Sequence, residues 1–131
     1  MKEPAQPDRR AILLVDHGSR LAEANDSLAE VAALVARRSP EYVVKHAHME
    51  LAEPTIEHGF DACVEAGAVD VTVHPYLLAP GRHATLDIPR LVREAARKHP
   101  GVTHRVTEPL GVHELIAEVI LARVREAARK P

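Results

Sequence analysis

Apolar and polar positions along the chain alternate between two spacings, one typical of buried strands and the other of amphipathic helices. The first apolar run, residues 11–15, is continuous and ends in Val15. Such a run is expected of a strand that is buried on both faces. Apolar residues then recur at helical spacing from Ala24 to Val35, and Pro40 follows that helix.

The second apolar run, residues 42–49, has a different character because its polar and apolar positions alternate. His46, His48 and Glu50 fall on one face of the predicted strand, and apolar residues fall on the other. A one-sided pattern of this kind indicates an edge strand, or a strand that faces a polar cleft.

The pattern then repeats. A helix is expected from near Pro54, and Gly67 is a plausible C-terminal stop. A third strand follows over residues 69–73. After it comes a longer connection, residues 76–83, and residues 87–89 (Asp-Ile-Pro) are predicted to open the third helix.

The last strand, residues 102–107, is the weakest of the four because charged and polar residues interrupt it. A final helical pattern begins at about Val112. Its apolar stripe consists of Leu115, Ile116, Val119, Ile120 and Val124.

Strand and helix that alternate four times predict an α/β fold with right-handed crossovers. We expect a three-layer sandwich around a four-stranded parallel sheet, with 2-1-3-4 as the strand order. Residues 1–10 are predicted to be a flexible tail, and residues 11–131 a single domain. In such sheets ligands bind beyond the carboxyl ends of the strands, where the strand order reverses. That point falls between the first and third strands.

Composition narrows the function. The 131 residues suffice for one domain. Their net charge of -2 and their three aromatic residues make nucleic acid an unlikely partner. No apolar run is long enough to span a membrane. Cys63 is the only cysteine, so an internal disulfide and a Cys-rich zinc site are excluded, and its place in a helical pattern suits a small buried residue. Together with a polar N-terminus that does not resemble a signal peptide, this predicts a cytoplasmic protein.

Candidate chemistry lies after the first and third strands, in residues 16–20 and 80–83. Each segment contains a Gly, a His and an Arg, and each leads toward a helix. His17 and His83 should therefore approach each other at one edge of the sheet, and Glu50 should join them from the second strand. Two imidazoles and a carboxylate are suitable ligands for a first-row divalent metal, and they also accept protons near neutral pH.

The other histidines are interpreted more plainly. His46 and His48 are read as a solvated strand face, whereas His74 either lines the cleft or only fills it. The remaining four are interpreted as surface or helix-end residues: His58, His99, His104 and His113.

Polar neighbours of the two candidate histidines also have ordinary interpretations. Asp16 and Ser19 are good helix N-cap residues. Arg20 and Arg82 acquire a role if the ligand is anionic, because Arg binds carboxylates in a bidentate manner. The sequence has no phosphate-loop pattern, no GxGxxG and no GxSxG elbow, so nucleotide binding and a serine hydrolase have no support.

Four segments together resemble a known family. They are residues 12–20 (ILLVDHGSR), 49–56 (MELAEPTI), 75–89 (PYLLAPGRH and DIP within it) and 109–111 (PLG). They resemble the motifs of small single-domain sirohydrochlorin chelatases of the CbiX/SirB type. The resemblance extends over about residues 11–124, nearly the whole chain.

The resemblance implies an ATP-independent chelatase that inserts Co²⁺ or Fe²⁺ into sirohydrochlorin in cobalamin or siroheme biosynthesis. It places the metal-binding and proton-accepting histidines on His17 and His83, and the catalytic carboxylate on Glu50. The metal is the substrate, with Ni²⁺ as a further possibility, and no nucleotide or redox cofactor is needed. Short members of the family are homodimers. The macrocycle carries many carboxylates. Three polar residues beside these histidines are therefore candidates for binding its periphery: Ser19, Arg20 and Arg82.

Two questions stay open at this stage. The same residues would serve a carrier that binds a metal or tetrapyrrole without turnover. A receiver-like domain is discounted, because Asp16 alone does not make the acidic cluster that it needs. The family also commonly has Gly where this chain has Asp16. That carboxylate could raise the pKa of His17, orient its ring or join the metal site.

Overall fold

The computed structural model describes residues 9–79 and 81–130, without the side chain of His83. The elements alternate throughout: β1 (Arg9–Asp16), α1 (Ala22–Arg38), β2 (Tyr42–His48), α2 (Ile56–Glu65), β3 (Ala68–Pro75), α3 (Arg82–Ala96), β4 (Thr103–Val106) and α4 (Glu114–Arg129). Residues 1–8 of the predicted tail lie outside the described residues. Arg9 and Arg10 do not belong to a tail, because they form the start of β1.

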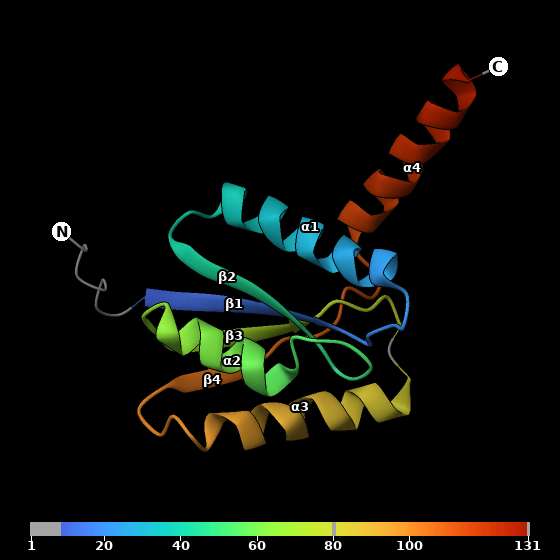
Figure 1. The fold of residues 1–131 in the computed structure, drawn as a ribbon. Coiled ribbons are helices and arrows are strands. Elements are labelled where there is room, and N and C mark those ends of the chain that lie inside the picture. The colour runs from blue at the N-terminus through green and yellow to red at the C-terminus, as the bar shows by residue number, and fades with distance from the viewer. Residues whose placement is uncertain (1–8, 80, 131) are drawn as a thin grey trace.

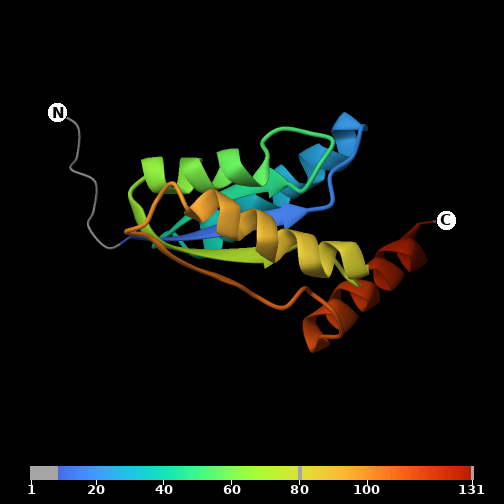
Figure 2. The ribbon, with the colours of Figure 1, turned by 90° about the horizontal axis from the view of Figure 1, so that it is seen from below.

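The four strands form one parallel sheet in the order β2-β1-β3-β4, which confirms the predicted order. Helices α2 and α3 lie on one face of this sheet and α1 lies on the other (Figures 1 and 2). As predicted, β2 is an edge strand. None of the described helices is both long enough and apolar enough to cross a membrane.

The main core lies between the sheet and the pair α2 and α3. It includes Leu13 from β1, Phe60 and Cys63 from α2, and Val92 from α3, all with 0% exposure. Burial of the Cys63 thiol is as the sequence predicted, and burial also raises its pKa to about 12. Such a thiol is a packing group and not a nucleophile at neutral pH.

Helix α3 begins earlier than the sequence predicts. It starts at Arg82 with Gly81 as its N-cap, and Pro89 lies inside it instead of in its first turn. The buried residues Ala84, Ile88 and Val92 explain this, because they form one apolar stripe along the helix and continue it on both sides of Pro89. Packing of this stripe outweighs the backbone hydrogen bond that a proline cannot donate. His83 thus belongs to the first turn of a helix.

Helix α4 differs from the other three because none of its residues is buried. It projects from the end of the sheet, away from the layers (Figure 1). Its apolar side chains are 45–67% exposed: Leu115, Val119, Ile120, Leu121 and Val124. An amphipathic stripe on a helix normally packs on a core. Within one chain, no residue of this stripe is buried in the described core.

Candidate active site

Three loops meet at the carboxyl edge of the sheet, where the candidate residues were expected. They connect β1 to α1, β2 to α2 and β3 to α3, and the three strands are neighbours in the sheet. The first carries His17, the second carries Glu50, and the third leads to Arg82 and His83 at the start of α3.

The structure brings His17 and Glu50 together. Nε2 of His17 lies 3.1 Å from Oε1 of Glu50, and the two side chains are 55% and 54% exposed. Their backbones are also joined, because the Glu50 N–H donates to the His17 carbonyl at 3.2 Å. An imidazole and a carboxylate are therefore held side by side in contact with solvent, where a metal ion or a proton can reach both.

Gly18 allows this close approach of the two loops. Its φ of +94° lies in the left-handed region, which favours glycine. A Cβ at this position would overlap the carbonyl oxygen of Glu50 and would lie 3.2 Å from Cβ of His48. The loop after His17 therefore packs directly on the backbone of the Glu50 loop.

Asp16 has a partner that the sequence did not reveal. Its Oδ1 accepts a hydrogen bond from Nδ1 of His48 at 2.6 Å, so the carboxylate is engaged with His48, whereas His17 contacts Glu50. His48 is 1% exposed, which makes it the buried polar residue of the described core. The interpretation of His48 as part of a solvated strand face was wrong, because α1 lies on one face of the sheet and the Gly18 loop packs close to the His48 side chain.

His46, two residues earlier on the same face, is half-buried. Its ring lies edge-on to the His48 ring, with 5.8 Å between the ring centroids. Burial lowers the pKa of His46, and the nearby His48 lowers it further against the opposing effect of Asp16. His46 is thus a neutral packing imidazole at pH 7.

His74, near the end of β3, is bound to the residue that follows β4. Its Nδ1–H donates to the hydroxyl of Thr107 at 2.8 Å, and that hydroxyl donates to the Glu108 carbonyl. Burial lowers the pKa of His74. The side chain lines a hollow of about 250 Å³ beneath the first turn of α4, together with His113 and Leu115. His74 lines this separate hollow and has no contact with His17 or Glu50 among the described residues.

Ser19 stabilises the loop in which it lies. Its hydroxyl accepts a hydrogen bond from the Leu21 N–H at 3.0 Å, and the amide side chain of Asn25 bonds to its backbone N–H and carbonyl. Arg20 and Arg82 are exposed beside this loop and at the start of α3. They are placed where the acidic edge of a ligand could reach them.

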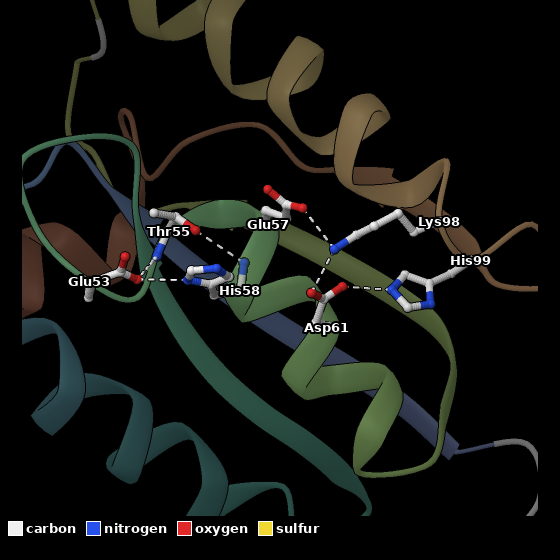
Figure 3. Close-up of polar contacts among 7 residues, drawn as sticks. All are labelled: Glu53, Thr55, Glu57, His58, Asp61, Lys98 and His99. Carbon is white, nitrogen blue, oxygen red and sulfur yellow. Dashed lines mark hydrogen bonds and ion pairs between the residues drawn. The ribbon is translucent and has the colours of Figure 1, made fainter.

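The remaining polar contacts near α2 and α3 lie on the outer surface of these helices (Figure 3). Asp61 accepts from Lys98 at 2.8 Å and from Nε2 of His99 at 2.7 Å, and thereby links α2 to the end of α3. Glu53 similarly pairs with His58 at 2.8 Å, which raises the pKa of the exposed His58. These contacts stabilise the surface and contribute no group to the candidate site.

Beside the candidate site, a pocket of about 210 Å³ opens between the ends of β3 and β4 and the first half of α3. It is lined mainly by apolar residues, including Pro75, Ala84 and Ile88. Ligand sites usually measure roughly 300–1,000 Å³. This pocket is therefore smaller than a usual ligand site.

Among the described side chains, no group of three or more His, Cys, Asp and Glu residues could hold a metal ion. The side chain of His83 lies outside the described part of the chain, so its predicted approach to His17 stays a prediction. The structure supplies one imidazole and one carboxylate in contact, beside the helix turn that carries His83.

Known proteins are similar to this chain in sequence and in fold. The CbiX family model matches residues 11–127. The chloroplastic sirohydrochlorin ferrochelatase of Arabidopsis thaliana is 42% identical over 118 residues, which cover 90% of this chain and 52% of that protein. The sirohydrochlorin cobaltochelatase of Methanococcoides burtonii is 31% identical, over 91% of this chain and 97% of that protein.

Among solved structures, the sirohydrochlorin chelatase SirB from Bacillus subtilis subspecies spizizenii, in complex with cobalt, superposes with a TM-score of 0.78. It is 34% identical, over 90% of this chain and 50% of that chain. The chain thus spans about half the length of several relatives and nearly the whole length of others. Sequence and fold agree over the same residues, and this protein belongs to the CbiX family.

Proposed function

We propose that this protein is a chelatase that inserts Co²⁺ or Fe²⁺ into sirohydrochlorin without ATP or a redox cofactor. The observation that carries the proposal is the contact of His17 with Glu50 at the carboxyl edge of the sheet, one loop away from the helix turn of His83. The names of the relatives, which are ferrochelatases and cobaltochelatases of sirohydrochlorin, support the same reaction.

The reaction exchanges one divalent ion for two pyrrole protons. In the proposed mechanism, neutral His17 and His83 bind the incoming ion through their imidazole nitrogens. Glu50 accepts one proton because its carboxylate already lies beside His17, and imidazole or water takes the other. The ion then passes to the four macrocycle nitrogens, and the two protons leave to solvent.

The periphery of the substrate suits the exposed side chains around the site. Sirohydrochlorin carries several carboxylates. Arg20 is exposed on the loop that carries His17, and Arg82 is exposed at the start of α3. Because Arg binds carboxylates in a bidentate manner, we assign both to substrate binding. Ser19 contributes through the loop that it stabilises.

An absorbance time course tests the reaction directly. Sirohydrochlorin is mixed with Co²⁺, Fe²⁺ or Ni²⁺, with and without a catalytic amount of protein. Many turnovers per protein with one of these metals would establish the chelatase, and the fastest metal identifies the preferred substrate. A spectral change that stops at one equivalent would establish a carrier instead.

Substitution of the histidines tests the assigned residues. We expect the double variant His17→Ala/His83→Ala to lose about a hundredfold or more of kcat, because both metal ligands and proton acceptors are removed. His58→Ala is the matched control, since His58 forms a similar exposed pair with Glu53 at 2.8 Å. Full activity in the double variant, with unchanged folding by circular dichroism, would refute the mechanism.

We also propose that the active form is a homodimer in which α4 packs against a second copy. The exposed apolar stripe on α4 supports this. Relatives of about twice the length have room for a second unit of this size, whereas others match this chain over nearly their whole length. In a short chain, a second copy would take the place of the second unit for which the longer relatives have room.

Light scattering coupled to size exclusion tests the dimer. The wild type should have twice the 14.3 kDa mass of one chain. Val119→Glu/Ile120→Glu should shift it to a monomer, while Leu34→Glu on the outer face of α1 should not, because that side chain is an isolated exposed residue. A wild-type monomer at micromolar concentration would refute the proposal.

We also propose that the protein is cytoplasmic and that residues 11–131 form a single domain. We propose further that it binds neither nucleic acid nor membranes. Fractionation of cells that express the full chain would test the location. Binding assays with nucleic acid and with lipid vesicles would test the two expected absences. Recovery of the protein with membranes would contradict the predicted location.

A further inference from the structure

Two Asp–His pairs in this protein have nearly the same donor–acceptor distance but lie in different parts of the fold. In one, Asp16 at the end of β1 accepts from the buried His48 at the end of β2, at 2.6 Å. In the other, the surface pair, Asp61 of α2 accepts from His99, just beyond α3, at 2.7 Å (Figure 3), and the two side chains are 26% and 21% exposed. The surface pair is explained by the link between two helices, whereas the buried pair needs another explanation.

The buried pair costs the fold something. Placing the imidazole of His48 in the interior, against an Asp16 carboxylate that is 19% exposed, is unfavourable unless both groups are satisfied, and an apolar pair of similar shape is often as stable. The β1–β2 sheet edge does not need the pair for cohesion, because the strands are already joined through the register from Arg10 and Tyr42 to Asp16 and His48. Its position, more than its energy, is therefore informative.

That position is the last register step before the candidate site. Asp16 is directly followed by His17, and His48 is two residues before Glu50. Pairing continues beyond the strands, because the Asp16 carbonyl accepts from the Met49 N–H at 2.9 Å and the His17 carbonyl accepts from the Glu50 N–H at 3.2 Å. The His48 N–H donates to the Pro54 carbonyl at 2.8 Å, which ties the other end of the Glu50 loop to the same point.

The Asp16–His48 hydrogen bond thus joins the two peptide segments from which His17 and Glu50 extend. A small change in the register or separation of the strand ends would move His17 relative to Glu50, since both loops leave directly from this pair. The contact of Gly18 with the Glu50 backbone leaves little room for the loops to adjust independently.

We propose that Asp16 and His48 are positioning residues that hold His17 and Glu50 at the separation needed for metal insertion. This inference rests on the proposed function and deepens it. It also explains Asp16, which acts through His48 and the strand ends without touching the metal or the macrocycle.

Steady-state kinetics of four variants test the proposal, with Co²⁺ and sirohydrochlorin as substrates. We expect Asp16→Ala to lower kcat about tenfold or more, as loss of supporting partners does in metal sites, with KM changed less than twofold. Asp16→Asn should retain most activity, because an amide oxygen still accepts from His48. The double variant Asp16→Ala/His48→Leu should regain thermal stability relative to Asp16→Ala, but its kcat should stay low.

Asp61→Ala is the matched control. It breaks an Asp–His pair of nearly the same length, together with the Lys98–Asp61 ion pair, and we expect a small loss of stability with unchanged kcat. Wild-type kcat in Asp16→Ala would overturn the proposal. So would a kcat that recovers with stability in the double variant, or an equal loss of kcat in Asp61→Ala, because each would reduce the buried pair to a contribution to folding.

A readout that does not depend on turnover separates this inference from the proposed function. Two-dimensional ¹H–¹⁵N NMR of the histidine rings reports the surroundings of Nε2 of His17. A changed His17 signal in Asp16→Ala, with the wild-type signal in Asp16→Asn and Asp61→Ala, is expected even if the wild type does not insert metal. An unchanged His17 signal in Asp16→Ala would overturn the positioning role, whereas absence of wild-type turnover alone would overturn only the chelatase.

Discussion

The two faces of the sheet are built in different ways. The face toward α2 and α3 carries the larger apolar core, in which Leu13, Val71 and Val73 of the strands are 0% exposed. The face toward α1 has a small core around Leu14, Leu28 and Ala32, and beyond it the strands carry His46, His48 and His74. Helix α4 stands away from both faces (Figure 1).

Stability and function are thus divided between the two faces. The α2–α3 face contributes most of the burial, so it holds the strands in order. The α1 face has polar side chains near the carboxyl edge, where Asp16 and His48 lie next to the candidate site. A chain can place costly polar groups there because the opposite face already stabilises the sheet.

Removing a large side chain from the apolar face should have the largest effect. We expect Phe60→Ala to lower the free energy of unfolding by about 3–5 kcal/mol, because Phe60 is completely buried between α2 and the sheet. Urea denaturation followed by circular dichroism measures this value. A loss below about 1 kcal/mol would mean that this face is not the main core.

The same kind of truncation on the other face should cost less. Leu28→Ala removes the largest buried apolar side chain that α1 contributes, and we expect a loss of about 2–3 kcal/mol, toward the low end for Leu→Ala. The loss is smaller because fewer buried residues surround Leu28. Urea denaturation again measures it, and a loss larger than that of Phe60→Ala would reverse the proposed ranking of the two faces.

The half-buried histidines should make the α1 face sensitive to acid. Burial lowers the pKa of His46 and His74 from the ordinary value of 6.5, so the unfolded chain binds more protons than the folded chain as pH falls below that value. The stability that they contribute is present above pH 6.5 and is lost as pH falls toward the lowered pKa. Thermal melts from pH 7.5 to 5 should show this decline, and His74→Asn should make it shallower. An equally steep decline in His74→Asn would contradict this role.

The surface pairs on α2 and α3 should matter least. Lys98→Ala breaks two exposed ion pairs, to Glu57 and Asp61, each 2.8 Å long. We expect a loss of at most about 1 kcal/mol, which added salt reduces, because exposed pairs are solvated and screened. Melting temperatures at low and high salt measure it. A salt-independent loss would show that the Lys98 chain acts through packing.

Much of the architecture follows from the sequence alone. The apolar runs and helical spacings predicted four strands and four helices, because strands and amphipathic helices have different periods. The expected strand order, 2-1-3-4, is also the observed one. The motifs around His17 and Glu50 also placed these two residues at neighbouring strand ends, and the structure brings them together.

Other features depend on contacts between distant residues, so tertiary structure alone decided them. Asp16 and His48 are 32 positions apart and meet only through the register of β1 and β2, which local patterns do not specify. Helix α3 extends N-terminal to Pro89 because packing overrides the local preference of proline. The apolar period of α4 predicted a helix, but a period specifies no partner, and within one chain this helix packs on none of the described core.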